Sequence, residues 1–150
     1  MADNISELLR TTRWGEQFAP SDLDVIAKFM SVRTFDDGQS IFEQGDKEAF
    51  LAFIVEGSVD IAKEVTESLE KIVVTLRAKT HFGELSFVDA QPRSASAIAR
   101  GDVTILVFSR AGFDSLVKED PDLGIKIQQT LLLSISRRLR MTTRELIYRD

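Results

Sequence analysis

Apolar residues recur at two different spacings along this 150-residue chain, and the change of spacing divides it into three regions. Near the N-terminus they recur every three or four residues, which is typical of helices. Between Val32 and Phe108 short apolar runs alternate with glycine-containing turns, which predicts an all-β sandwich or barrel. After Ser109 the helical spacing returns. The pattern therefore predicts an α+β fold in which helices flank a β-roll.

The first 17 residues are mostly polar and predict a short, mobile helical arm, outside a domain that spans residues 18–150. Its bulky anchors are Leu8, Leu9 and Trp14. A second helix is expected to begin at Pro20-Ser21, with Ser21 as its N-cap and Asp24 at the capping-box position. The apolar stripe of that helix consists of Leu23, Ile26, Ala27 and Met30.

The central region contains two apolar runs, residues 50–55 and 103–108, that predict buried strands. Residues 59–62 and 72–76 are predicted hairpin partners, and the polar stretch 63–71 between them is the expected exposed tip. Turn signals lie at Asp37-Gly38, Gln44-Gly45-Asp46 and Glu56-Gly57.

Two helices are expected after the strands. Ser109 is a suitable N-cap for a helix that extends to Lys118 and turns Phe113, Leu116 and Val117 inward. Asp120 followed by Pro121 is a strong start signal for a last helix, at about residues 121–148, because proline lacks the N–H that would be unpaired there.

The last helix carries two apolar tracks. The first has the three-four spacing of a short coiled coil and consists of Ile125, Gln128, Leu132, Ile135, Leu139, Thr142 and Leu146. The second consists of Ile127, Leu131 and Leu133, which would pack the helix on its own barrel. We therefore expect one face to meet the barrel and the other to meet a partner helix in a symmetric homodimer.

Composition indicates one ordinary cytoplasmic domain. The hydrophobic fraction is 43% and the charged fraction 29%, with no cysteine, no secretory signal and no apolar stretch long enough to cross a membrane. The net charge of −5 argues against nucleic acid as the main partner. We therefore expect neither a nucleic-acid partner nor a membrane partner.

The sequence does not favour an enzyme. A cupin-type metal site needs several histidine or carboxylate ligands, whereas the chain has one histidine, His81, with no relay partner visible in the sequence. We expect His81 to pack or be solvated beside a strand. A glycine-rich phosphate loop with a lysine is also missing, so neither a metal nor a cofactor is expected.

Residues 82–96 combine features that suit a cyclic phosphate and its ribose. Gly83 lets the backbone approach a ligand, and residues 85–88 could form one helical turn with free N–H groups. Arg93 presents a planar set of donors that matches a phosphate. Glu84 can accept a hydrogen bond from a sugar hydroxyl, which a site for phosphate alone would not need.

This run resembles the phosphate-binding cassette of cyclic nucleotide-binding domains, the family of the catabolite activator protein, protein kinase regulatory subunits and cyclic-nucleotide-gated channels. The family pattern is Phe-Gly-Glu-Leu-small, a short turn, then Pro-Arg-small-Ala-Ser/Thr, and all of it is present. The resemblance covers about residues 18–150. Further matches are the strand-turn glycines Gly38, Gly45 and Gly57 and the Asp120-Pro121-Asp122 helix start.

The resemblance implies a double-stranded β-helix or jelly-roll-like barrel that binds a 3′,5′-cyclic nucleotide. It implies that Arg93 pairs with the phosphate and that Glu84 takes the ribose 2′-hydroxyl. The implied cradle is completed by amides of Gly83, Leu85, Ser86, Ser94 and Ala95. Val74 and Leu76 are candidates for apolar contact with the base.

Residues 137–143 are also similar to the final helix of the catabolite activator, which implies that Thr142 and Thr143 contact the base. This likeness favours cAMP over cGMP. Threonines in helices more often bond their own backbone, which is the simpler interpretation. Five arginines between Arg137 and Arg149 indicate either a phosphate or membrane patch or a solvated helix face, and we favour the latter.

Two other functions stay open. The fold could be a vestigial dimerisation or scaffold module, or the sensor fragment of a longer transcription regulator. A chain without a recognition helix should not read DNA by itself. A live sensor is expected to signal through its last helix, either by dimer geometry or to an effector protein.

Overall fold

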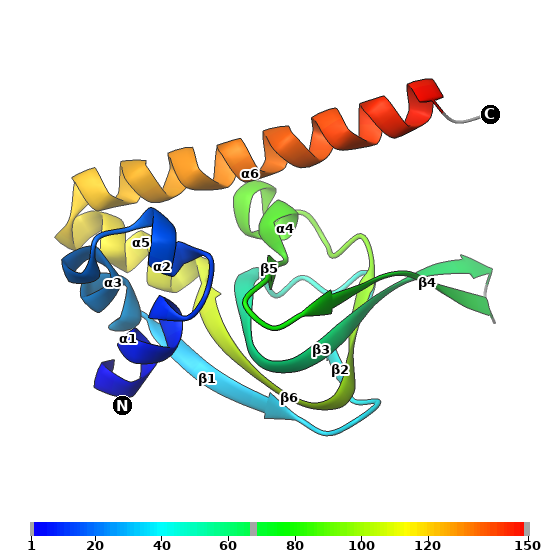
Figure 1. Ribbon diagram of the computed structural model, residues 1–150, viewed down its shortest axis with the longest axis horizontal. Coiled ribbons are helices and arrows are strands. Elements are labelled where there is room, and N and C mark those ends of the chain that lie inside the picture. Colours follow the sequence, from blue (N-terminus) through cyan, green and yellow to red (C-terminus); the bar gives the residue numbers. More distant parts are fainter. Residues whose placement is uncertain (1, 67–68, 149–150) are drawn as a thin grey trace.

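The computed structural model describes residues 2–66 and 69–148 (Figure 1). The helices are α1 (Ala2–Arg10), α2 (Trp14–Gln17), α3 (Pro20–Ala27), α4 (Glu84–Asp89), α5 (Arg110–Glu119) and α6 (Pro121–Tyr148). The strands are β1 (Met30–Phe35), β2 (Ser40–Phe42), β3 (Phe50–Thr66), β4 (Leu69–Arg77), β5 (His81–Phe82) and β6 (Ser96–Ser109). The long helix α6 crosses one side of the strands (Figure 1).

Two long antiparallel strands, β3 and β6, form the centre of the sheet and pair from Phe50 with Ser109 to Ala62 with Ser96. Each changes its second neighbour partway along: β6 pairs with β2 and then β1, and β3 with β5 and then β4. Because the second neighbours differ, the sheet curls into a roll instead of lying flat. The predicted α+β class with a β-roll is confirmed.

Gly57 does not end a strand, as its turn signal predicted, but lies inside β3. It has φ +91°, and the pairing register with β6 shifts between Ile54 and Glu56 and again between Glu56 and Ser58, across the glycine. A Cβ atom at this position would lie 2.3 Å from the Asp102 carbonyl oxygen. The glycine therefore forms a bulge that bends the strand and makes β3 longer than the sequence predicted.

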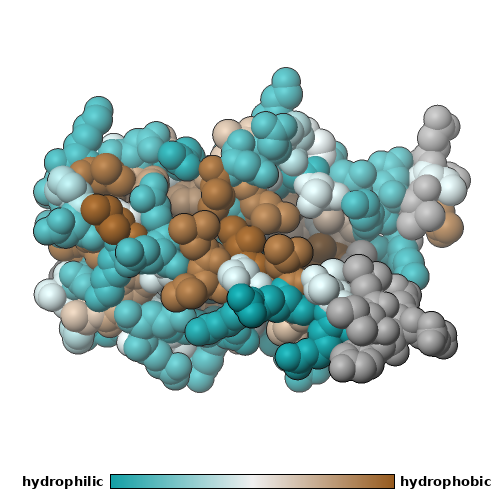
Figure 2. Space-filling view, turned by 90° about the horizontal axis from the view of Figure 1, so that it is seen from above, coloured by the Kyte–Doolittle hydropathy of each residue, from teal (hydrophilic) through white to brown (hydrophobic). Residues whose placement is uncertain are grey.

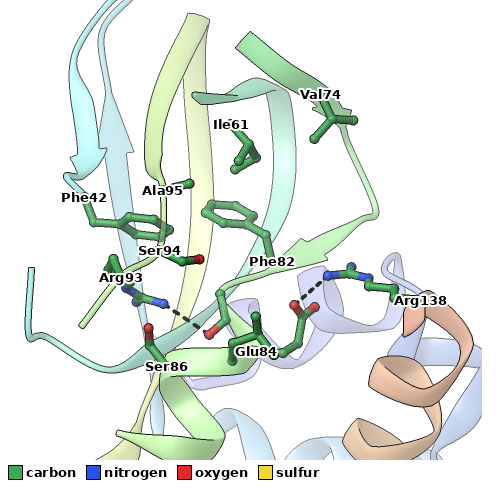
Figure 3. A pocket seen from close by; sticks show the side chains of 12 residues that line it. Phe42, Ile61, Val74, Phe82, Glu84, Ser86, Arg93, Ser94, Ala95 and Arg138 are labelled. Atoms are coloured by element: carbon green, nitrogen blue, oxygen red, sulfur yellow. Dashed lines mark hydrogen bonds and ion pairs between the residues drawn. The ribbon is translucent and has the colours of Figure 1, made fainter. Parts of the chain in front are cut away.

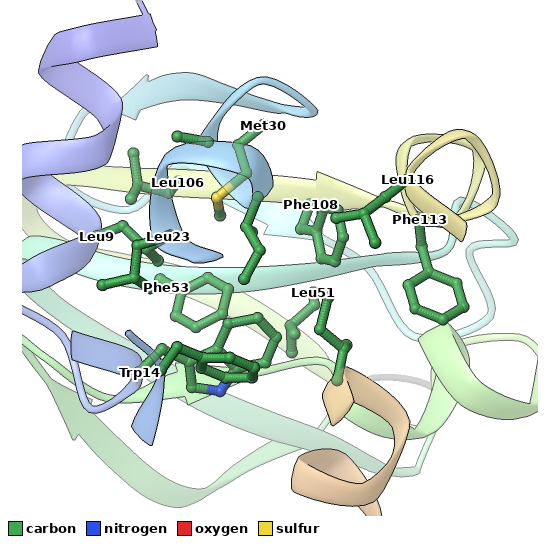
Figure 4. Close-up of a cluster of buried hydrophobic side chains, with 14 of the residues drawn as sticks. Leu9, Trp14, Leu23, Met30, Leu51, Phe53, Leu106, Phe108, Phe113 and Leu116 are labelled. Atoms are coloured by element: carbon green, nitrogen blue, oxygen red, sulfur yellow. The ribbon is translucent and has the colours of Figure 1, made fainter. Parts of the chain in front are cut away.

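The first 17 residues are not a mobile arm, because their apolar side chains form part of the hydrophobic core (Figure 4). Leu9 and Trp14 are fully buried. The Trp14 ring lies 4.9 Å from the Phe18 ring and 4.8 Å from the Phe53 ring, centroid to centroid. These contacts attach α1 and α2 to the roll.

Helix α3 begins two residues earlier than an N-cap at Ser21 would allow, and its actual N-cap, Ala19, makes no side-chain cap bond. The predicted capping box is therefore wrong. Pro20 takes the first helical turn, where it needs no acceptor. Asp24 instead accepts hydrogen bonds from Ser6 and Arg10 of α1. The predicted apolar stripe is confirmed for Leu23, Ile26 and Ala27, which are buried, but it is wrong for Met30, which is buried as the first residue of β1 and not on the helix.

The predicted hairpin and helix caps are confirmed. Val59 pairs with Leu76 and Ile61 with Val74. The predicted tip at 63–71 is too long, because the strands continue to the pair of Thr66 with Leu69; residues 67–68 lie outside the described residues. The Ser109 hydroxyl accepts a hydrogen bond from the Gly112 N–H at 2.9 Å. The Asp120 carboxylate accepts one from the Leu123 N–H at 3.1 Å, which begins α6.

Helix α6 uses one apolar track for packing and leaves the other exposed. Leu123, Ile127 and Leu131 are buried, but Leu133 is 58% exposed, so its predicted packing is wrong. It follows Ile127 by six residues, which places it on a different helix face. Other exposed apolar side chains on α6 are Ile125, Leu132, Leu139 and Met141, while the Leu146 side chain lies outside the described set.

A hydrophobic patch crosses the surface on the α6 side of the molecule (Figure 2). Ile125, Leu132 and Leu139, at intervals of seven residues, lie on the predicted coiled-coil track and are all more than half exposed. None of the helices in the described ranges is apolar over a length that would cross a membrane.

Candidate functional site

A cavity of about 200 Å³ lies between the roll and α4 (Figure 3). The predicted cassette residues all line it: Gly83, Glu84, Leu85, Ser86, Arg93, Ser94 and Ala95. The structure therefore brings together two segments, the start of α4 and the residues before β6, that the sequence separates by a turn. Phe42, Ile61, Val74 and Phe82 add apolar surface from the strands.

Gly83 connects β5 to α4 in a conformation and a space that suit only glycine. Its φ is +88°, in the left-handed region. A Cβ atom there would lie 2.8 Å from both the Arg93 Nη1 atom and the Phe50 carbonyl oxygen. The first N–H groups of α4 have no acceptor within the helix, so they are available to a ligand in the cavity.

Arg93 is a buried cation that uses backbone carbonyls as acceptors. It is 4% exposed; its Nη1 donates to the Gly83 carbonyl at 3.1 Å and its Nη2 to the Phe50 carbonyl at 2.8 Å. Its guanidinium carbon lies 4.0 Å from the centroid of the Phe42 ring. Its Nε is buried and has no hydrogen-bond partner within residues 2–66 and 69–148.

Burial lowers the pKa of Arg93 to about 10, although the carboxylates of Glu48, Asp46 and Glu84 act in the opposite direction. The side chain therefore stays charged at neutral pH. It forms no ion pair with any carboxylate in the described part of the chain. A buried arginine with an unused N–H and no direct counter-charge suits an anion in the cavity.

Glu84 is also buried, at 3% exposed, and both of its oxygens have partners. Oε1 contacts the Nδ1 atom of His81, and Oε2 accepts a hydrogen bond from the Arg138 Nη1 at 2.8 Å. Burial alone would raise the pKa of Glu84, but the hydrogen-bonded His81 and the Arg138 guanidinium outweigh burial and lower it. Glu84 is thus held as an anionic hydrogen-bond acceptor.

His81 and Arg138 are the functional neighbours that the sequence analysis missed. His81 is buried beside the rings of Trp14 and Phe53, and its partner Glu84 lies only three residues later, a spacing that could have signalled the pair. Arg138 follows Glu84 by 54 residues, so no local pattern connects them. Arg138 lies exposed on the helix face that was predicted to be solvated, but it also pairs with Glu84, a contact that was not predicted; Arg149 lies outside the described residues.

The candidate base contacts divide in two. Val74 lines the cavity, whereas Leu76 does not and packs partly buried in the core of the roll. Thr142 and Thr143 are exposed, and their hydroxyls donate at 2.9 Å to the carbonyls of Arg138 and Leu139. The backbone bonding expected of helical threonines is thus present, and this chain's cavity does not include them.

Comparison with known proteins gives a family and several relatives. The family model for the cyclic nucleotide-binding domain matches residues 32–120. The cyclic AMP receptor protein of Thermus thermophilus is 30% identical over 128 residues, which are 85% of this chain and 57% of that protein. The type II regulatory subunit of the cAMP-dependent protein kinase of Drosophila melanogaster is 34% identical over 83 residues, 55% of this chain and 22% of that subunit. The chain thus spans little more than half of the bacterial relative.

Solved structures show the same fold. A cyclic nucleotide-binding domain from Methylobacillus flagellatus superposes on this chain with a TM-score of 0.82 at 23% identity. The superposition covers 99% of this chain and 84% of that domain's chain. The catabolite activator protein of Thermus thermophilus gives a TM-score of 0.73 at 29% identity, covering 86% and 59%. The family match extends over more than half of the sequence and includes the whole cassette. This chain belongs to the cyclic nucleotide-binding domain family.

Proposed function

We propose that the chain binds a 3′,5′-cyclic nucleotide in the cassette cavity, with the cyclic phosphate on Arg93. The observation that carries the proposal is the state of Arg93, a buried cation at the cavity wall with an unpaired Nε and no carboxylate partner in the described ranges. Five N–H donors belong to a guanidinium, and Arg93 gives one to each of two carbonyls. The remaining donors and the amides of Gly83, Leu85, Ser86, Ser94 and Ala95 suit phosphate oxygens.

In this proposal the ribose 2′-hydroxyl donates to Glu84. An ionised carboxylate has about four lone-pair sites, so Glu84 can accept a further hydrogen bond beside those from His81 and Arg138. Its lowered pKa keeps it ionised at neutral pH. The pairing of one fixed anion with one fixed cation would select a sugar phosphate over inorganic phosphate.

We favour cAMP over cGMP. Two relatives have cAMP in their names: the cyclic AMP receptor protein of Thermus thermophilus and a cAMP-activated global regulator of Mycobacterium tuberculosis. Ile61 and Val74 offer apolar contact to a base. Thr142 and Thr143 could reach the base only in a rearranged or dimeric state, since neither lines the cavity here.

Signal output is proposed to pass through α6. Arg138 joins this helix to Glu84, the proposed ribose acceptor. A ligand that binds Glu84 would favour one position of Arg138 over others and so shift the position of α6. The readout would be dimer geometry, a cytoplasmic effector protein or a following domain, as in a longer regulator.

The proposed homodimer uses the exposed coiled-coil track of α6. Leu132 and Leu133 provide a matched test, because they are 61% and 58% exposed but only Leu132 lies on that track. Sedimentation should show that Leu132→Glu dissociates the dimer, whereas Leu133→Glu leaves it. Equal effects of the two changes would argue against this interface.

Amide NMR shifts measured while cAMP is added to the protein test the binding site. The proposal expects saturable shifts for Gly83, Ser86, Ser94 and Ala95. Gly38, in a turn, and Gly101, inside β6, do not line the cavity; they are the internal controls, and their shifts should not change. Absence of shifts from a folded protein would favour the vestigial dimerisation module instead.

A further inference from the structure

A second groove, of about 560 Å³, lies against the N-terminal half of the molecule and shares one wall residue, Arg138, with the cassette cavity. It is formed where α2, the turn before β5 and the middle of α6 meet. Its polar lining includes Arg13, Thr80, His81, Ser134 and Arg137. The cassette residues Gly83, Glu84 and Arg93 do not line it, so it is a separate site.

The groove is built largely from segments outside residues 32–120, the range of the family model. Its α2 wall is held in place by the fully buried Trp14 ring and by a hydrogen bond from the Arg13 N–H to the Lys79 carbonyl at 3.3 Å. Its α6 wall is held by the contacts of Arg138 with Glu84 and the His81 carbonyl. Both walls are therefore fixed before any ligand arrives.

The charge of the groove is opposite to that of the chain. Three arginines and one histidine line it, and no aspartate or glutamate of the described residues does, although the chain has a net charge of −5. Within the described ranges, Arg13 and Arg137 make no side-chain ion pair. Leu133 and Met141 add apolar surface beside these cations.

We infer that this groove binds a small organic phosphate, with the phosphate between Arg13 and Arg137 and its apolar part against Leu133 and Met141. The volume lies within the range of about 300–1,000 Å³ that is usual for small-molecule sites. Arginine suits this ligand because its planar donors bind phosphate oxygens in pairs. The unpaired arginines make a phosphate a better occupant than a neutral molecule.

Because Arg138 lines both sites, a ligand in the groove would affect the cyclic nucleotide site, an inference that rests on the proposed function. An anion in the groove would compete with Glu84 for this guanidinium, whose side chain is 52% exposed although it is hydrogen-bonded to Glu84 and to the His81 carbonyl. Occupancy of the groove would therefore weaken the hydrogen bond that holds Glu84, the proposed ribose acceptor. The effect of each ligand on the affinity for the other must be reciprocal.

The test uses inorganic pyrophosphate and the Arg93→Ala variant of the whole chain, in which the cassette has lost its phosphate partner. Amide NMR shifts are recorded at constant ionic strength, because screening would otherwise change as the anion is added. The expected result is saturable shifts at Arg13, Thr80, Ser134 and Arg137. Citrate is titrated in parallel, and tighter binding of citrate than of pyrophosphate would overturn the choice of phosphate.

A double variant, Arg13→Gln with Arg137→Gln, should lower the affinity for pyrophosphate by about tenfold or more. Arg140→Gln is the matched control, since Arg140 is exposed on the same helix but does not line the groove. No saturable shift, or an equal loss in the control, would overturn the inference. Neither outcome depends on cyclic nucleotide binding, which is measured separately with the unmodified protein.

Discussion

The Arg138 guanidinium lies 2.8 Å from the Glu84 carboxylate, and this contact joins the last helix to the first residue of α4. The two ends of the pair differ in environment, because the Glu84 side chain is 3% exposed and that of Arg138 is 52% exposed. The carboxylate is therefore fixed by its surroundings, while the arginine can respond to changes on either side of it. This asymmetry makes the pair a suitable connection between the cavity and α6.

Replacing Arg138 by glutamine should destabilise the protein by roughly 1–2 kcal/mol, because it removes a charged donor from a buried carboxylate. Urea unfolding of the two proteins measures this difference. Arg140→Gln makes the same chemical change on the exposed surface of α6 and should have almost no effect. If both variants lose the same stability, Arg138 does not hold Glu84 in solution.

Acid should weaken the fold through Glu84. Its pKa is lower in the folded protein than its ordinary value of 4.5, so the ionised form stabilises the fold above that pH. This contribution is lost as the pH falls from 4.5 through the folded pKa. The free energy of unfolding of the unmodified protein should therefore approach that of Glu84→Gln on acidification.

Urea titrations at several pH values measure the difference, and Glu119→Gln, on the exposed surface of α5, controls for general charge effects. A difference that stays constant below pH 4.5 would contradict the prediction.

Gly83→Ala should lower the free energy of unfolding by more than the same substitution at Gly38. Gly38 has a similar φ, +81° against +88°, but open space around its Cβ position. Gly38→Ala should destabilise the protein only because alanine is unfavourable in the left-handed conformation, by about 1–2 kcal/mol. At Gly83 the clash with Arg93 and the Phe50 carbonyl should add about 1–3 kcal/mol and displace Arg93. Thermal or urea unfolding compares the two variants. Equal losses of stability would mean that the backbone around Gly83 shifts to accommodate the added Cβ atom.

Ala90 is the reverse case, since it ends α4 with φ +59°, a conformation that costs alanine energy. Ala90→Gly should stabilise the protein by roughly 0.5–1 kcal/mol. Ala111→Gly, inside α5, should instead destabilise it by a similar amount, because glycine loses more entropy in a helix. Loss of stability in Ala90→Gly would show that this residue is relaxed in solution.

Much of the fold could be predicted because it depends on local signals. The caps at Ser109 and Asp120 and the hairpin register of Ile61 with Val74 each follow from a few neighbouring residues. The errors have a different origin. Glycine is common both in turns and in bulges, so the sequence around Gly57 does not distinguish the two. Only the close approach of Asp102 from β6 decides in favour of the bulge.

The candidate site was predictable to the extent that it is contiguous. Gly83, Glu84 and Arg93 lie within eleven residues, and the motif places them in one cavity. Arg138 reaches that cavity only because Leu123, Ile127 and Leu131 pack α6 onto the rest of the core. The burial of Trp14 likewise depends on Phe18, Phe53 and Phe108, which are distributed over the whole chain.

Isothermal titration of the protein with cAMP, and in parallel with cGMP, tests the central claim most directly. The proposal predicts saturable binding of one nucleotide per chain, with cAMP tighter than cGMP. Arg93→Ala should weaken it by about ten- to a hundredfold or more without unfolding the protein, whereas Arg77→Ala, exposed on β4 away from the cavity lining, should not. Binding as tight in Arg93→Ala as in the unmodified protein, or no heat with either nucleotide from the folded chain, would contradict the account.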